Sequence, residues 1–188
     1  MALAGLTESM NALVKTNSGR RAVFFDRDNT LVVDRGYTFR VEDLRWIAGA
    51  PAAIQRFNDA GWLVVVCTNQ SGVARGFFGE ADVLAFHTAM SRSLSAMGAK
   101  IDAFYYCAHH PDAVVERYRG DHPERKPNPG MLLRAMRELG IDASSSLMIG
   151  DSASDIAAAT GAGVEGWLFP GGRLDDFVGK LPQFATTS

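Results

Sequence analysis

Short apolar segments alternate with longer helical patterns along this chain, and this alternation limits the fold more than any other feature of the sequence. The apolar segments are rich in β-branched and aromatic residues and comprise 22–25, 62–67, 103–107, 146–150 and 164–169. Strands that are apolar throughout and separated by helices belong to a parallel sheet covered on both faces. We therefore predict an α/β fold with a doubly wound, Rossmann-like parallel sheet, helices on both faces and no large cap domain.

Four intervening segments carry the sequence signals of helices. They are 51–60, 80–97, 129–139 and 151–160. Two begin with proline, all four are followed directly by glycine, and the segment 80–97 repeats apolar residues with a period of 3.6.

The length and composition bound the class of protein. The 188 residues fit one domain, and we assign 1–20 to an N-terminal extension and 21–188 to the domain. A net charge of −2 argues against nucleic acid or an anionic membrane as a partner. No apolar run reaches the roughly 18 residues of a membrane span. Two cysteines are too few for a disulfide scaffold and are consistent with a reducing compartment, so we expect a cytoplasmic protein. We also expect a monomer.

Polar residues follow each of the first four predicted strands. They are DRDNT (26–30), TNQSGVARG (68–76), the more distant RKPNPG (125–130) and GDSASD (150–155). In a doubly wound sheet, ligands bind beyond the carboxyl ends of the strands. These segments can therefore converge on one site that is rich in carboxylates, cations and amide or hydroxyl groups.

The carboxylates of these segments point to metal-assisted phosphate chemistry. If Asp26 and Asp28 meet Asp151 and Asp155, the cluster is stable only with a cation, and oxygen ligands with phosphate favour Mg²⁺. Asp26 could then attack phosphorus as a nucleophile. Asp28 shares its strand face and could serve as acid and base. The alternative for this segment is an ordinary turn, in which Asp and Asn are common.

Three further residues suit a phosphoryl group. Thr68 and Asn69 offer hydroxyl, amide and backbone N–H groups, and Lys126 offers a cation. Taken singly, these residues are as well explained by a helix cap and a solvated surface lysine. Their order along the chain favours the phosphate site.

In this order, the four segments resemble the signatures of the haloacid dehalogenase superfamily of phosphatases. DRDNTLVVDRGY, TNQSGVARG, YYCAHHP and RKPNPGM are similar to its D-glycero-D-manno-heptose 1,7-bisphosphate 7-phosphatase branch, which is close to the histidinol-phosphate phosphatases. The resemblance covers about residues 21–169. The resemblance implies a hydrolase that acts on a small phosphorylated sugar. It also implies a place in carbohydrate metabolism, in the synthesis of nucleotide-activated heptose for surface lipopolysaccharide.

The resemblance also implies roles for individual residues. It makes Asp26 the nucleophile and Asp28 the acid/base. The implied Mg²⁺ ligands are the Asp26 carboxylate, the Asp28 backbone carbonyl and the Asp151 carboxylate. The implied phosphate ligands are Thr68, Asn69 and Lys126, and the implied substrate ligands are Arg75 and Arg125, with residues 34–37 on a flap over the site.

The chain departs from the family pattern at two positions near the carboxylates. Asn29 stands where the family usually has glycine, and we expect the turn to persist because Asn tolerates left-handed backbone conformations. Ser152 stands where the family often has lysine, which removes a cation near the metal.

A third departure concerns Zn²⁺. Many branch members hold the metal with Cys-x-His and a later Cys-x-Cys. This chain retains Cys107 and His109 but has His122 and Glu124 at the later pair. All four side chains can ligate zinc. A zinc clamp and a metal-free loop therefore both remain open.

Three rival functions are weighed against the heptose phosphatase. Histidinol phosphate or another small sugar phosphate is a rival substrate. A signalling receiver domain also phosphorylates an aspartate, but it lacks an acid/base two residues along, and Asp28 argues against it. A nucleic-acid end phosphatase would need a basic groove, which the composition does not suggest.

Overall fold

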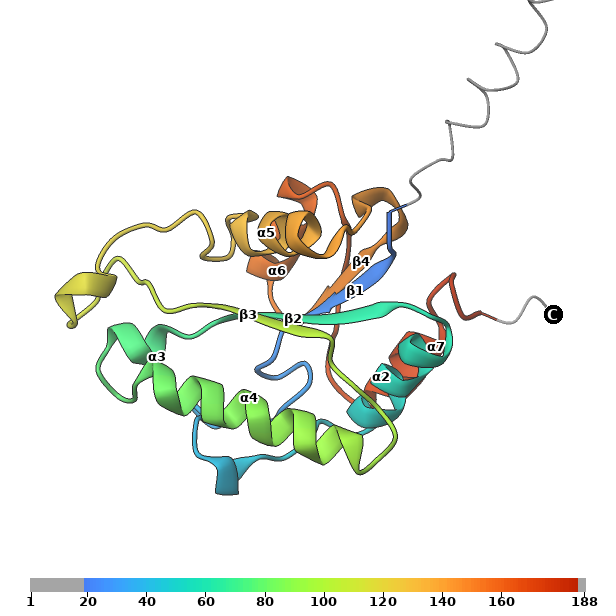
Figure 1. The fold of residues 1–188 in the computed structure, drawn as a ribbon, viewed down its shortest axis with the longest axis horizontal. Coiled ribbons are helices and arrows are strands. Elements are labelled where there is room, and N and C mark those ends of the chain that lie inside the picture. The colour runs from blue at the N-terminus through green and yellow to red at the C-terminus, as the bar shows by residue number, and fades with distance from the viewer. Residues whose placement is uncertain (1–18, 186–188) are drawn as a thin grey trace, which may run out of the picture.

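The structure, a computed structural model, describes residues 19–185. A five-stranded parallel sheet of order β3-β2-β1-β4-β5 runs through its centre (Figure 1). The strands are β1 (Ala22–Phe25), β2 (Leu63–Asn69), β3 (Ala103–Cys107), β4 (Leu147–Gly150) and β5 (Glu165–Leu168). The predicted fold class is confirmed, and every predicted strand is present with bounds shifted by at most about two residues. Of the predicted extension 1–20, all but residues 19 and 20 lie outside the described residues.

The order of the strands reverses beside β1. The chain passes from β1 to β2 and β3 on one side, then crosses to β4 and β5 on the other. Strand β4 pairs directly with β1, so the carboxyl ends of these two strands are neighbours. In doubly wound sheets this switch point is where ligands bind.

Alternate residues of β1 enter two separate cores. Val23 and Phe25 pack on the side of α2 (Ala50–Asp59), α4 (Glu80–Ser95) and α7 (Leu174–Gly179). Ala22 and Phe24 pack on the side of α5 (Gly130–Leu139) and α6 (Ala153–Gly161). All four side chains are fully buried, which explains why this strand has no polar position.

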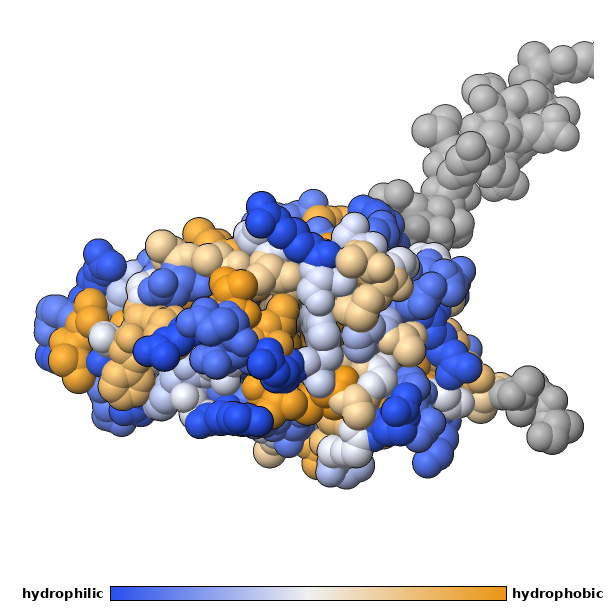
Figure 2. Space-filling model, turned by 90° about the horizontal axis from the view of Figure 1, so that it is seen from below, coloured by the Kyte–Doolittle hydropathy of each residue, from blue (hydrophilic) through white to orange (hydrophobic). Residues whose placement is uncertain are grey.

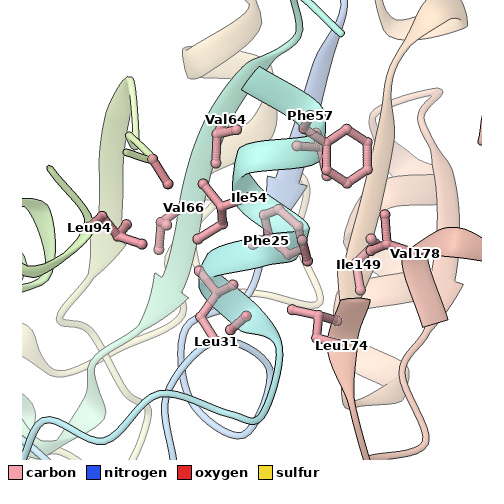
Figure 3. Close-up of a cluster of buried hydrophobic side chains, with 14 of the residues drawn as sticks. Phe25, Leu31, Ile54, Phe57, Val64, Val66, Leu94, Ile149, Leu174 and Val178 are labelled. Carbon is pink, nitrogen blue, oxygen red and sulfur yellow. The ribbon is translucent and has the colours of Figure 1, made fainter. Parts of the chain in front are cut away.

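Helices lie on both sides of the sheet, with α5 and α6 above it and α2, α4 and α7 below it in Figure 1. Figure 3 shows the core below the sheet, where Phe25 and Ile149 of the strands meet Ile54 of α2 and Leu174 of α7. Burial of these large side chains stabilises the fold by about 1.5–3 kcal/mol each. The strand ends that carry the polar residues are thereby held rigidly.

Two helices were not predicted from the sequence. Helix α3 (Ser71–Ala74) has four residues and α7 has six, which is too short to show a hydrophobic period. Helix α6 begins at Ala153 instead of the predicted 151, because Ser152 is its N-cap and forms a capping box with Asp155.

Two long connections rise above the carboxyl edge of the sheet. Residues 26–49 contain the 3₁₀ turn η1 (Val41–Asp43), and residues 108–129 contain η2 (Glu116–Tyr118). A small cluster of buried residues joins α3 to the second connection and includes Val73, Phe78, Ala113 and Tyr118. Within residues 19–185 each of these connections contains a single 3₁₀ turn as its regular structure, so they do not form a cap domain.

The molecular face on the side of α4 is mixed in character. Figure 2 shows hydrophilic residues lying between hydrophobic ones on this face. Val41 and Leu84 are among the exposed apolar side chains of the protein, whereas the inner residues of α4 are buried. None of the described helices combines the length and the apolar character that a membrane crossing requires.

The turn after β1 depends on Asn29. This residue has a φ of 57°, so it adopts the left-handed conformation expected from the sequence. Its backbone N–H donates to the Val32 carbonyl at 2.7 Å, and its side-chain oxygen accepts from the Asp34 N–H at 3.1 Å. Asn29 therefore closes the turn that separates the carboxylates from residues 34–37, the predicted flap.

We expect Asn29→Ala to be less stable than Asn29→Gly by about 1 kcal/mol, because both variants lose the amide contact but only alanine is strained at positive φ. Chemical denaturation of the two purified variants measures this difference. Equal stabilities would show that backbone strain at residue 29 is unimportant.

Candidate active site

The carboxylates of residues that are far apart in sequence meet at the switch point. Asp26 follows β1, and its backbone N–H donates to the Ile149 carbonyl of β4 at 3.0 Å. Carboxylate oxygens of Asp26, Asp151 and Asp155 all lie within 4.8 Å of one another. The structure therefore brings Asp26 and Asp151 together, as their positions after two strands predict.

Lys126 is the cation at the centre of this cluster. Its Nζ lies 2.6 Å from Oδ1 of Asp26 and 2.6 Å from Oδ1 of Asp155. The lysine is almost fully buried. Burial alone would lower the pKa of Lys126, but the negative charges of Asp26 and Asp155 outweigh that effect. The pKa of Lys126 is therefore held above its usual range, and the ammonium is retained.

Asn69 fixes the main chain of Lys126. Its side-chain Nδ2 donates to the Lys126 carbonyl at 2.9 Å, and its Oδ1 accepts from the Lys126 N–H at 3.1 Å. The amide predicted to bind phosphate is thus engaged with the lysine. Because Asn69 is the last residue of β2, it holds the loop that carries Lys126, called here the lysine loop, against the sheet.

Asp155 is held by groups on both sides. Its Oδ1 accepts from Lys126, and its Oδ2 accepts from the Ser152 N–H at 3.1 Å and from the Ser152 hydroxyl at 2.7 Å. A Cβ atom on Gly150 would lie 2.4 Å from Asp155. The segment GDSASD therefore needs glycine at its first position to let Asp155 approach the lysine.

The charges of the cluster do not balance. Three carboxylates against one ammonium leave two negative charges when all are ionised. Burial raises the pKa of Asp26 to about 7, against the opposing effect of Lys126. Burial and the charge of Asp155 also raise the pKa of Asp151. These oxygen donors fit a hard divalent ion such as Mg²⁺, which would favour the ionised forms.

Asp28 lies beside the cluster and is held by two residues that the sequence patterns did not single out. Arg27 donates through Nε to Oδ1 at 2.9 Å and through Nη2 to Oδ2 at 3.1 Å. Gln70 donates through Nε2 to Oδ2 of Asp28 at 2.9 Å and to the Thr68 hydroxyl at 2.8 Å. Burial raises the pKa of Asp28, and the Arg27 guanidinium works against that effect.

Arg27 is buried to an unusual degree for an arginine, with 1% of its surface exposed. Its Nη2 donates to the Thr38 carbonyl at 2.9 Å, and its guanidinium lies 4.8 Å from the centre of the Phe86 ring. The sequence signal available for Arg27 was a charged side chain at the second position after a buried apolar strand. Gln70 had no comparable signal, because a glutamine in a loop is usually solvated.

The remaining phosphate and substrate candidates lie around this group. Thr68 is fully buried at the end of β2. Arg75 is the C-cap of α3, and Arg125 precedes Lys126 and donates through Nη1 to the His109 carbonyl at 3.0 Å. Burial and the charge of Arg75 are among the effects that lower the pKa of Arg125.

A second group of metal-ligating side chains lies in the loop after β3. Ligand atoms of Cys107, His109 and His122 lie within 4.8 Å of one another, and the two imidazole rings stack with their centres 4.2 Å apart. Glu124, predicted as the fourth ligand, is not part of this group. Its Oε2 instead pairs with Nη1 of Arg134 at 2.9 Å, because α5 carries that arginine alongside the loop.

Comparison with known proteins places these features in a family. A family profile described as HAD-hydrolase-like matches residues 124–181. The chain is 45% identical over 162 residues to the D-glycero-beta-D-manno-heptose-1,7-bisphosphate 7-phosphatase of Rhodopseudomonas palustris, covering 86% of this chain and 90% of that one.

Two solved structures are also similar. A putative HAD-like phosphatase from Mesorhizobium loti has a TM-score of 0.78 and 39% identity, covering 82% of this chain and 74% of that one. The D,D-heptose 1.7-bisphosphate phosphatase from B. bronchiseptica, complexed with magnesium and phosphate, has a TM-score of 0.73 and 33% identity, covering 86% and 87%.

We expect Gly150→Ala to lose most of its phosphatase activity and about 1–3 kcal/mol of stability, because the new methyl group would displace Asp155 from Lys126. Phosphate release and thermal melting measure the two effects. Gly79→Ala is a matched control, since the nearest atom to its new Cβ is 3.7 Å away. Wild-type activity in Gly150→Ala would contradict the packing argument.

Proposed function

Because the chain belongs to the haloacid dehalogenase-like superfamily of phosphatases, in the branch of its heptose 1,7-bisphosphate 7-phosphatase relatives, we propose that it removes the 7-phosphate of D-glycero-D-manno-heptose 1,7-bisphosphate. The identity with a named phosphatase over 90% of that protein's length supports this substrate. The observation that carries the chemistry is the meeting of Asp26, Asp151 and Lys126 at the switch point. In the same proposal, residues 21–188 form one phosphatase domain that acts in the cytoplasm.

Asp26 is the nucleophile of the proposed reaction. Among residues 19–185 the side chain that donates to its carboxylate is Lys126, and that contact uses Oδ1. The other oxygen, Oδ2, forms a bond to phosphorus while the bond from phosphorus to the sugar oxygen breaks. The product of this step is an aspartyl-phosphate and a sugar alkoxide that requires a proton.

Asp28 moves the proton in both halves of the reaction. Its raised pKa favours the acid form that protonates the departing sugar oxygen. As a carboxylate it then takes a proton from the water that attacks the phospho-aspartate, which releases inorganic phosphate and restores Asp26. Arg27 and Gln70 keep this carboxylate beside the reacting group. This second step separates a phosphatase from a receiver domain, whose phospho-aspartate must persist.

In this proposal Mg²⁺ would be held by the carboxylates of Asp26 and Asp151, which lie close together, and by the backbone carbonyl of Asp28. When bound, the ion supplies positive charge that screens the phosphate from the carboxylates. In this proposal, Thr68, Asn69 and Lys126 hold the transferring phosphoryl group. Asn69 also positions Lys126 through its hydrogen bonds to the lysine main chain. Arg75 and Arg125 contact the sugar or its second phosphate, and the flap 34–37 covers the site.

We expect Asp26→Asn to lower kcat by more than about 10³-fold without unfolding the protein, because the amide keeps the shape of the side chain but is a poor nucleophile. Phosphate release and circular dichroism measure activity and fold. Asp59→Asn is the control, since Asp59 is an exposed aspartate on α2. Appreciable turnover by a folded Asp26→Asn protein would remove Asp26 as the nucleophile.

The substrate is tested by phosphate release from the heptose bisphosphate, histidinol phosphate and other sugar phosphates, each with and without Mg²⁺. The proposal predicts the highest kcat/KM for the heptose bisphosphate and loss of turnover in a chelator. Faster hydrolysis of histidinol phosphate would assign the chain to the rival substrate.

Zinc binding by the loop after β3 is a separate part of the proposal. Cys107, His109 and His122 supply one sulfur and two nitrogen ligands of the kind that zinc prefers. Burial raises the pKa of the Cys107 thiol, so a bound cation would be needed to favour the thiolate. The alternative is a metal-free loop held by its own hydrogen bonds.

We expect protein purified without chelators to contain close to one Zn²⁺ per chain, and Cys107→Ala to lose it, because that variant lacks the thiolate ligand. Elemental analysis measures the metal. Cys67→Ala is a matched control, since Cys67 is the other free, buried cysteine and is not in the cluster. Absence of zinc from the wild-type protein would favour the metal-free loop.

A further inference from the structure

Three hydrogen-bond donors gather next to the lysine loop from separate segments of the chain. Arg75 comes from the end of α3, His110 from the connection after β3, and Arg125 from the residue before Lys126. Nη2 of Arg75 lies 3.4 Å from Nε2 of His110. His110 was not assigned a role from the sequence.

The hydrogen bond on the far side of the His110 ring fixes its tautomer. The backbone N–H of Asp112 donates to Nδ1 of His110 at 3.0 Å, so Nδ1 carries a lone pair. A neutral imidazole with an accepting Nδ1 has its proton on Nε2.

It follows that Arg75 and His110 face each other as two donors. Neither N–H can satisfy the other, because the Nε2 of this tautomer has no lone pair to offer. Nε of Arg75 is also buried without a hydrogen-bond partner among the described residues. Buried donors without acceptors are uncommon and call for a ligand that supplies the missing oxygen atoms.

The charges of this group point to the same kind of ligand. Within residues 19–185, neither Arg75 nor Arg125 has a carboxylate at ion-pair distance. Asp112 approaches only Nδ1 of His110, at 4.0 Å, and its side chain is 85% exposed. Two guanidinium groups without counter-charges, beside a neutral N–H donor, match a phosphate, which accepts several charge-assisted hydrogen bonds.

We propose that His110 is a specificity-determining residue that binds the second phosphate of the sugar through Nε2–H, together with Arg75 and Arg125, while the first phosphate reacts at Asp26. The inference rests on the proposed function, in which Arg75 and Arg125 contact the sugar or its second phosphate, and adds His110 to the residues that recognise that phosphate. Arg125 directly precedes Lys126, whose Nζ contacts Asp26. The two phosphates lie at opposite ends of the same small sugar. The second phosphate therefore binds in a subsite next to the place where the first one reacts.

The test compares two substrates that differ only in this phosphate, D-glycero-D-manno-heptose 1,7-bisphosphate and the corresponding 7-phosphate. We expect His110→Ala to raise KM for the bisphosphate about 10-fold more than KM for the monophosphate, because it removes one hydrogen bond to a charged group. His110→Gln should recover most of this loss, since its side-chain amide retains an N–H donor. Asp112→Asn, on the same loop, is the control and should leave the ratio of the two KM values unchanged.

Equal changes in KM for the two sugars in His110→Ala would overturn the role of His110 while leaving the phosphatase intact. Failure of the wild-type chain to hydrolyse either sugar would instead overturn the proposed function. The tautomer is measured without substrate from the ¹⁵N chemical shifts of the imidazole. A protonated Nε2 is expected, and a protonated Nδ1 would overturn the inference whatever the kinetics show.

Discussion

The bridge that Lys126 makes between Asp26 and Asp155 is the interaction on which the rest of the site depends. All three side chains are buried, and both contacts are 2.6 Å long. A buried carboxylate without its partner is strongly destabilising, so the lysine makes this acidic cluster compatible with the folded state. Asn69 and Ser152 extend the bridge to β2 and α6 by holding Lys126 and Asp155 in place.

This arrangement also explains why the cluster is reactive. One ammonium only partly offsets the carboxylates, and burial keeps the pKa of Asp26 near 7. A divalent cation completes the neutralisation and lets a phosphate approach the Asp26 carboxylate. In the described part of the chain Arg75 and Arg125 have no carboxylate at ion-pair distance, so their positive charge extends the favourable region for anions away from the reacting group. The site thereby has one end suited to phosphoryl transfer and another suited to recognition.

The sheet and the main carboxylates could be predicted because both follow from local patterns. Apolar runs identify the strands, and the carboxyl ends of parallel strands meet at one edge, which is sufficient to bring Asp26 near Asp151. Contacts between loops could not be predicted in this way. Arg27 on Asp28, Asn69 on the lysine main chain and the pairing of Glu124 with Arg134 all depend on how distant segments pack.

The most direct test of the central claim is a calorimetric titration of Mg²⁺ into the full chain, carried out in buffers of different ionisation enthalpy. The protein is used either with zinc bound or with zinc removed. Because the pKa of Asp26 is about 7 without the ion, Mg²⁺ binding should release protons near pH 6.5 and almost none near pH 9. One Mg²⁺ per chain with this pH-dependent release is the predicted result. No binding, or binding without proton release at pH 6.5, would contradict the account of a buried carboxylate cluster that a cation completes.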